Sequence, residues 1–331
     1  MTTDLGGIQD AAFALAIQAD GKLVAAGVSD VGGSSDFALA RYNTDGTPDP
    51  SFGSAGKVIT DFSGSGSTDQ AVALAIQSDG KIVAAGITDI LCCNTENFAL
   101  ARYNPDGTLD ATFGSAGKVI TDFSGSDSDD YAYALAIQSD AKILAGGFSN
   151  ANGFYDFALA RYNPDGALDT SFGSSGKVLT DFVNEQDVTY SLAIQSDGEI
   201  VAGGYSFGDF ALARYDPDGT LDRSFGSGGK VTTDFSGSGS FEIAFAIAIQ
   251  SDGKIVATGP SDASGSYDFA LARYNSNGTL DASFGSAGIV MTDFSGSGSF
   301  DWPTALAIQA DGKIVAVGDS DGDFALARYS R

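Results

Sequence analysis

Short apolar runs separated by turn residues fill the chain, and this pattern predicts β-strands. In one stretch Ala-Leu-Ala-Ile-Gln (73–77) is followed by Ser-Asp-Gly (78–80) and then by Lys-Ile-Val-Ala-Ala-Gly (81–86). Two apolar runs joined by Asp-Gly are typical of a β-hairpin. Equivalent hairpins begin at Leu15, Leu135, Leu192, Ile247 and Leu306.

A third apolar run, Phe-Ala-Leu-Ala-Arg-Tyr, identifies the repeats. It begins at Phe37 and returns at Phe98, Phe157, Phe210, Phe269 and Phe324. The first five copies are each followed by a turn, such as Asn-Pro-Asp-Gly (104–107), and then by a run rich in β-branched residues, such as Lys-Val-Ile-Thr-Asp-Phe (118–123). Such residues favour strands. The chain therefore repeats a unit of four predicted strands, with a period typical of propellers and solenoids.

The two ends of the chain decide between these architectures. The sixth copy stops at Tyr329 and lacks a fourth strand, while Met-Thr-Thr-Asp-Leu (1–5) matches the fourth-strand sequence Val-Thr-Thr-Asp-Phe (231–235). A closed ring explains why one repeat is divided between the two ends, and closure hides a sheet edge. We therefore predict one all-β domain over residues 1–331. It is a six-bladed β-propeller with four antiparallel strands per blade, and the N-terminal strand completes the last blade and closes the ring.

Two motifs carry a resemblance to a known family. They are Asp-Phe-Ala-Leu-Ala-Arg-Tyr-Asn-Pro-Asp-Gly, as at 156–166, and Ala-Leu-Ala-Ile-Gln-Ser-Asp-Gly-Lys-Ile-Val-Ala-Ala-Gly, as at 73–86. Their copies cover essentially the whole chain, which closely resembles the bacterial delta-sixty repeat family and is distantly similar to NHL-type propeller repeats. The resemblance implies a bacterial protein that is exported or surface-associated. It supplies no catalytic residues.

The charge of the chain restricts its partners. Lys and Arg number 17 against 43 Asp and Glu, a net charge of −26, which repels nucleic acid and anionic membrane surfaces. The absence of histidine removes the commonest general base and any Ser-His-Asp or Cys-His machinery. No apolar run approaches the roughly 20 residues of a membrane helix. We expect a monomer that binds no nucleic acid and does not insert into membranes.

The cysteines and the first residues bear on localisation. Cys92 and Cys93 are adjacent, so they cannot join distant segments; they are either two ordinary thiols in a loop or a strained vicinal disulfide. Residues 1–4 lack the basic and apolar regions of a signal peptide. The family resemblance nevertheless favours an extracellular or cell-surface location, with any export signal outside this sequence.

The variable connections between second and third strands are the candidate functional surface, because function usually lies in variable loops on a rigid scaffold. They share one end of the blades, which we call the top; the hairpin turns lie at the opposite end, the bottom. An acid stands five positions before each first-strand Leu or Ile near this surface: Asp10, Asp69, Asp130, Asp187, Glu242 and Asp301.

These six acids have three interpretations. If the first strands line a central channel, the acids face one another and either bind calcium or have raised pKa values. Each acid could instead accept backbone N–H bonds where its strand begins, or take part in catalysis. The turn at 104–110 also places oxygen-bearing side chains around a glycine. It lacks the full EF-hand pattern, and we interpret it as a rigid turn.

Aromatic residues gather beside the acids in some repeats only. Tyr131, Tyr155 and Trp302, the only tryptophan, are the principal candidates. Because the repeat does not require them, they favour a stacking surface for sugar rings or a protein contact; the alternative is that they fill gaps between blades. The others are Tyr133, Phe154, Tyr190, Tyr205, Phe207, Phe241, Phe245, Tyr267 and Phe300.

The top loops contain no Lys, Arg or His, and we expect the repeated basic positions to point toward the bottom. Without a metal, such a surface has no cation for phosphate, sulfate or uronate, which argues against phosphatase, nuclease and polyanion lyase chemistry. We predict a non-catalytic binding or structural propeller that presents its acidic, aromatic top face to a glycan or a protein, with calcium as a candidate cofactor. The alternative is a glycoside hydrolase using paired top-face carboxylates.

Overall fold

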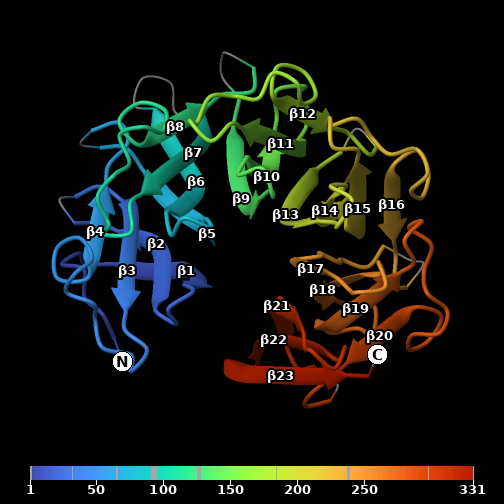
Figure 1. Ribbon diagram of the computed structural model, residues 1–331. Helices are drawn as coiled ribbons and strands as arrows, with labels where there is room; N and C mark the ends of the chain where they lie inside the picture. Colours follow the sequence, from blue (N-terminus) through green and yellow to red (C-terminus); the bar gives the residue numbers. More distant parts are fainter. Residues whose placement is uncertain are drawn as a thin grey trace. The chain divides into compact units, whose positions relative to one another are not determined.

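The computed structural model describes residues 2–31, 33–64, 66–90, 95–124, 128–183, 185–236, 239–296 and 298–330. Within these ranges the regular structure is entirely β, and the strands form five four-stranded sheets and one three-stranded sheet (Figure 1). The same ranges contain no helix long and apolar enough to cross a membrane. The adjacent pair Cys92 and Cys93 lies outside the described residues, so the state of its thiols stays open.

Each repeat forms one sheet, or blade, whose strands pair with their neighbours in chain order. The bounds are, for blade 1, β1 Asp10–Ile17, β2 Leu23–Ser29, β3 Asp36–Tyr42 and β4 Lys57–Thr60; for blade 2, β5 Asp69–Ile76, β6 Ile82–Ile90, β7 Thr95–Tyr103 and β8 Lys118–Thr121; for blade 3, β9 Asp130–Ile137, β10 Ile143–Ser149, β11 Asp156–Tyr162 and β12 Lys177–Thr180; for blade 4, β13 Asp187–Ile194, β14 Ile200–Ser206, β15 Asp209–Tyr215 and β16 Lys230–Thr233; for blade 5, β17 Ala246–Ile249, β18 Ile255–Ser261, β19 Asp268–Tyr274 and β20 Ile289–Thr292; and for blade 6, β21 Asp301–Ile308, β22 Ile314–Ser320 and β23 Asp323–Tyr329.

The predicted all-β, six-bladed propeller is confirmed. Blade 6 has three strands in the described residues. Two apolar side chains of its third strand are exposed to solvent, Phe324 at 107% and Leu326 at 62%. Their counterparts in blade 2, Phe98 and Leu100, are fully buried. The fourth strand predicted for this blade from residues 1–5 therefore stays a prediction, and Met1 itself lies outside the described residues.

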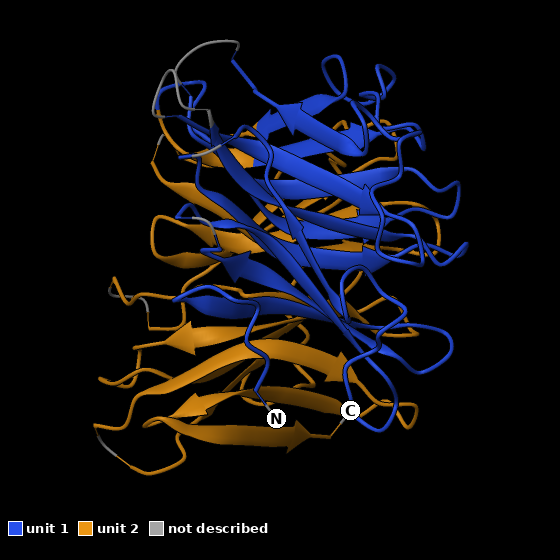
Figure 2. Ribbon diagram, turned by 90° about the vertical axis from the view of Figure 1, so that its left-hand side faces the viewer, with its two compact units in different colours: residues 1–153, 158–179 blue, residues 154–157, 180–331 orange. Residues whose placement is uncertain are grey.

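The chain divides into two compact units (Figure 2). Unit 1 contains residues 1–153 and 158–179, and unit 2 contains residues 154–157 and 180–331. Blades 1 and 2 belong to unit 1, blades 4 to 6 belong to unit 2, and blade 3 supplies residues to both. The expectation of a single domain over the whole chain stays a prediction.

Neighbouring blades within a unit pack face to face, which is why both faces of their strands are apolar. In unit 1 Phe37 and Leu39 of blade 1 share a core cluster with Ile82 and Tyr103 of blade 2. Tyr103 is fully buried, and its hydroxyl bonds at 2.9 Å to Thr60 Oγ1 of blade 1. This bond satisfies a polar group that would be costly to bury alone. Equivalent bonds join Tyr162 to Thr121, Tyr215 to Thr180, Tyr274 to Thr233 and Tyr329 to Thr292.

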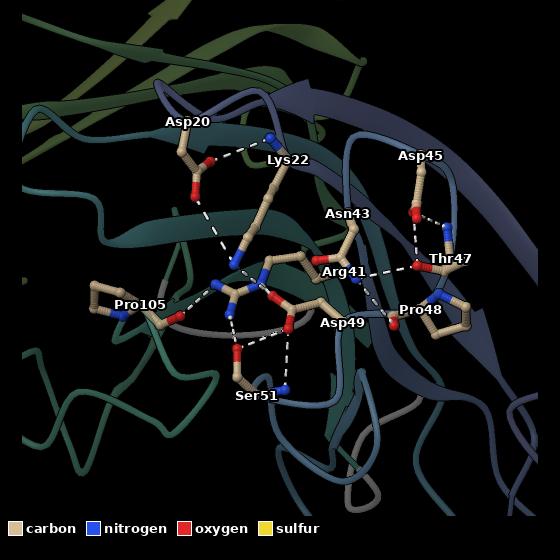
Figure 3. A network of polar contacts seen from close by, with 10 residues as sticks. All are labelled: Asp20, Lys22, Arg41, Asn43, Asp45, Thr47, Pro48, Asp49, Ser51 and Pro105. Carbon is tan, nitrogen blue, oxygen red and sulfur yellow. Dashed lines mark hydrogen bonds and ion pairs between the residues drawn. The ribbon is translucent and has the colours of Figure 1, made fainter.

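In blades 1 to 5 a buried arginine holds the bottom of the blade, as Figure 3 shows for blade 1. In blade 1 Arg41 Nε donates to Asp49 Oδ2 at 2.8 Å, and its Nη1 donates to the carbonyl of Pro105 in blade 2. Lys22 Nζ contacts the same carboxylate oxygen at 2.9 Å, and the guanidinium lies 4.6 Å from the centre of the Phe52 ring. The arginine therefore neutralises a buried acid and joins two blades.

The turn at 104–110 has the same structural role. Asp106 Oδ1 accepts bonds from the backbone N–H and the hydroxyl of Thr108 at 3.0 and 2.7 Å. Asp110 pairs with Arg102 at 2.8 Å. Carboxylate oxygens of Asp106 and Asp110 are thus bonded to other groups of the protein. These bonds agree with the interpretation of 104–110 as a rigid turn.

Residues 2–5 make the same contacts with blade 1 that the fourth-strand segment of one blade makes with the next blade. Thr3 Oγ1 bonds to the Tyr42 hydroxyl at 2.8 Å, and Lys57 Nζ donates to the carbonyl of Asp4. Leu5 N donates to Asp10 Oδ2 at 2.7 Å. In blades 1 and 2 the corresponding contacts are Tyr103 with Thr60, Lys118 with the Asp61 carbonyl, and Phe62 with Asp69.

Candidate functional site

In every blade except blade 5, a β-bulge near the top of the first strand positions the candidate acid. The pairing of β5 with β6 is interrupted between Ala71 and Ala73, and a Cβ on Gly86, opposite the interruption, would lie 1.8 Å from the carbonyl oxygen of Gln70. Glycine is therefore required in the repeated Ala-Ala-Gly segment, because the bulged backbone approaches it closely. The bulge keeps Asp69, at the start of the strand, in a fixed position.

The acid at this position joins three segments. Asp69 Oδ2 accepts the backbone N–H of Phe62, just after β4, at 2.8 Å, and its own N–H donates to the carbonyl of Ser35, just before β3, at 2.6 Å. The prediction that these acids accept backbone N–H bonds is thus confirmed for one carboxylate oxygen. The same oxygen accepts such a bond in Asp10, Asp130, Asp187 and Asp301.

These acids are buried or half-buried, and the ring of six facing carboxylates expected from the sequence stays a prediction. Asp10 is half-buried, and the other five are fully buried: Asp69, Asp130, Asp187, Glu242 and Asp301. Within either unit, no group of clustered carboxylates among the described residues contains two of the six. The burial accompanies backbone bonding, which in Asp69, Asp130, Asp187 and Asp301 ties the carboxylate to a residue just after the fourth strand of the preceding blade.

Each of four junctions instead brings three carboxylates together. The β3–β4 register pairs Phe37 with Thr60, so Asp36 and Asp61, the residues beside them, are neighbours at the top of blade 1. Asp69 joins them from blade 2, and one oxygen of each lies within 4.8 Å of the others. We call such a group a carboxylate triad; the others are Asp156, Asp181 and Asp187; Asp209, Asp234 and Glu242; and Asp268, Asp293 and Asp301.

Sequence reasoning missed two members of every triad. Asp36 stands at the start of the third-strand motif, and Asp61 stands at the end of the fourth-strand run. The signal was nevertheless present, since an acid precedes Phe-Ala-Leu-Ala-Arg-Tyr in five of the six copies, and antiparallel pairing places it beside the end of the fourth strand. In the remaining copy, Asn97 takes this position.

Crowding and burial disfavour charge in the triads. Burial raises the pKa of Asp36 to about 6, and the neighbouring charges of Asp61 and Asp69 add to the shift. Burial also raises the pKa of Asp187 to about 6, with smaller contributions from Asp181 and Asp156. The triads are therefore sites where a bound positive charge would relieve repulsion.

The fourth-strand lysines depart from the expectation that all basic side chains point to the bottom. Lys118 Nζ lies 3.0 Å from the carbonyl oxygen of Asp61 and 5.7 Å from the centre of the Phe62 ring. Lys177 and Lys230 make the same carbonyl contact with Asp122 and Asp181. These long side chains extend along the neighbouring blade to its upper end, so the top is less uniformly acidic than its loops suggest.

Aromatic rings form a continuous group in unit 2. Phe300 and Trp302 flank Asp301 in sequence, and their rings stack with 5.2 Å between centroids and 4° between planes. Tyr267 lies 5.2 Å from Trp302. Phe300 is 47% and Phe241 37% exposed. Pairwise contacts connect seven rings: Tyr190, Tyr205, Phe241, Phe245, Tyr267, Phe300 and Trp302.

Tyr131 and Tyr155 are the other two principal aromatic candidates. In unit 1 Tyr131 stacks on Phe148, with 4.7 Å between centroids, and lies 5.9 Å from Tyr133. Tyr155, in unit 2, presents its carbonyl to the backbone N–H of Asp187 at 2.6 Å. Of the three principal candidates, Trp302 is a member of the seven-ring group of unit 2.

Comparison with known proteins identifies the family. A profile described as "Domain of unknown function (DUF5122) beta-propeller" matches residues 18–52, 77–113, 138–172, 195–225, 250–284 and 309–331. The chain belongs to the DUF5122 beta-propeller family. The matched segments contain the hairpin turn and the second and third strands of each repeat and, in the first five repeats, the bottom turn that follows. The resemblances to delta-sixty and NHL repeats stay predictions. No curated protein matches the sequence.

Solved structures share the fold of this DUF5122 chain at low sequence identity. A protein from Lactobacillus plantarum is 13% identical with a TM-score of 0.56, covering 96% of this chain and 83% of that one. A catalytically inactive variant of virginiamycin B lyase from Staphylococcus aureus, determined with quinupristin, is 12% identical with a TM-score of 0.53, covering 92% and 76%. Such similarity indicates the propeller fold alone.

Proposed function

We propose that this protein is a non-catalytic binding propeller whose top face in unit 2 binds a glycan. The observation that supports the proposal is the group of seven touching aromatic rings from blades 4 to 6, with Phe241 and Phe300 partly exposed. The repeat does not require these rings, since blade 1 has Ala11 where blade 6 has Trp302.

The chemistry of the surface favours a neutral sugar. Aromatic faces stack on the apolar face of a sugar ring, while carboxylates and backbone groups beside them bond to hydroxyls. The net charge of −26 and the triads disfavour an anionic polymer.

The positions of the acids favour binding over hydrolysis. Asp130 and Asp301, which the hydrolase alternative would use, are fully buried, whereas a general acid must reach the glycosidic oxygen. The related lyase structure is inactive with a histidine replaced by alanine, and this chain contains no histidine to serve in its place.

A glycan array followed by calorimetry tests the proposal. The purified chain should bind a defined set of neutral glycans without converting them, and Trp302→Ala should weaken binding about tenfold, the upper range for one aromatic contact. Phe154→Ala is the matched control, because Phe154 is 50% exposed and outside the seven-ring group. Retention of a protein ligand but no glycan would contradict the glycan proposal. Turnover abolished by Asp130→Asn or Asp301→Asn would contradict the absence of catalysis.

A further inference from the structure

We infer that the four carboxylate triads are calcium sites, each at the junction between two blades. The two clearest are Asp36, Asp61 and Asp69 in unit 1, and Asp268, Asp293 and Asp301 in unit 2. Calcium prefers six to eight oxygen ligands at about 2.3–2.6 Å. Ligand oxygens around such an ion are separated by up to about 5 Å, so oxygens within 4.8 Å of one another fit without rearrangement.

Buried oxygens without partners point to a ligand independently of the clustering. Asp36 is 5% exposed and Asp268 is 2% exposed, and in both residues Oδ1 has no hydrogen-bond partner. Asp301 is fully buried, and its Oδ1 is likewise without a partner. A buried carboxylate oxygen without a partner is costly. A cation among the three acids would satisfy these oxygens at once.

The remaining oxygens hold the site in shape. Asp61 Oδ1 accepts the backbone N–H groups of Ser63 and Gly64 at 3.0 and 2.6 Å, and Asp69 Oδ2 accepts that of Phe62. At this junction the amino group of Lys118 donates to the backbone carbonyl of Asp61. Two of the three carboxylates are therefore fixed by the backbone, which leaves a preformed site for a hard cation.

Calcium fits better than magnesium. Magnesium requires near-ideal octahedral geometry at about 2.0–2.1 Å and retains several waters, whereas two of the three acids in each of these triads are buried. The junction in blade 2 provides an internal comparison, because Asn97, 2% exposed, replaces the first acid of the triad and removes one negative charge. We expect this junction to bind calcium most weakly.

Calcium titration of the full chain by calorimetry tests the inference. In about 150 mM KCl, which screens the diffuse field of the acidic surface, the wild type should take up calcium saturably, and EDTA should release it. The double variant Asp36→Asn, Asp268→Asn should lose two ions or bind them at least tenfold more weakly. Asn97→Asp should add one ion. Both changes follow natural precedent, since Asn and Asp each occupy this strand position in some repeat.

The control removes an acid at an exposed turn. Asp165→Asn alters a residue whose Oδ1 accepts the Ala167 N–H, and Asn277 already makes the equivalent bond in blade 5; uptake should match the wild type. Absence of saturable uptake by the wild type would overturn the inference, and this result does not depend on the variants folding. Unchanged uptake by the folded double variant, or equal affinity for magnesium, would also overturn it.

Discussion

Without calcium, the single change Asp36→Asn is expected to stabilise the protein at neutral pH. The pKa of Asp36 is about 6 rather than its usual 3.8, so the folded state binds more protons than the unfolded chain between those values. Stability therefore falls as the pH rises through this window and stays low above it. At about 1.4 kcal/mol per pKa unit, the buried charge costs up to roughly 3 kcal/mol at pH 7.5. An amide cannot ionise and avoids this cost.

Urea unfolding followed by circular dichroism measures the effect. In EDTA at about pH 7.5 the variant should unfold at higher urea than the wild type, by about 1–3 kcal/mol, because an amide without its own partner loses part of the gain. Near pH 4 the advantage should largely vanish, since Asp36 is then protonated in the folded wild type. With calcium at about 1,000 times its dissociation constant the order should reverse, because the ion at this site stabilises the wild type by about 4.1 kcal/mol.

The reasoning fails if the variant is less stable than the wild type in EDTA at neutral pH. That result would mean that Asp36 makes a favourable charged interaction that outweighs burial and the charges of Asp61 and Asp69. Asp165→Asn serves again as the control and should leave the urea midpoint unchanged at both pH values.

Three further outcomes follow from the scaffold. Arg102→Ala should lower the free energy of unfolding by about 1.5–3 kcal/mol, because it removes a charge-assisted hydrogen bond to the buried Asp110 and leaves Lys81, at 3.0 Å, as the cationic partner of that carboxylate; a loss below about 1 kcal/mol in urea unfolding would contradict this. Tyr103→Phe should cost about 1 kcal/mol, and a double-mutant cycle with Thr60→Val should attribute most of that to their mutual bond. Hydrogen bonds from Lys22 and Ser51 hold the pKa of Asp49 well below its usual range, so stability present above about pH 4 should be lost as the pH falls further; a melting temperature constant down to pH 2.5 would refute it.

The fold was predictable because its signals are repeated and local. Strand number, hairpin turns and blade count all follow from six copies of Phe-Ala-Leu-Ala-Arg-Tyr and the Asp-Gly turns around them. The bottom network was also implicit, since Arg102 and Asp110 recur at fixed spacing in every complete repeat. Closure of blade 6 rests on the sequence match of residues 1–5 and on their contacts with blade 1.

The candidate site was only partly predictable, because it depends on contacts between repeats. Asp69 was recognisable by its constant distance from the first strand. That it would be buried and would meet Asp36 and Asp61 of the preceding repeat depends on strand register and on how two blades pack. The seven-ring group likewise combines residues from three blades, so the sequence supplies its members but not the contacts between them.

The most direct test of the calcium inference is a crystal structure of the chain grown in calcium, with anomalous differences recorded to identify the metal. We predict anomalous density between Asp36, Asp61 and Asp69 and between Asp268, Asp293 and Asp301, with oxygen distances of about 2.3–2.6 Å, and weaker density beside Asn97. Water or no density at both triads, in crystals containing millimolar calcium, would contradict the account.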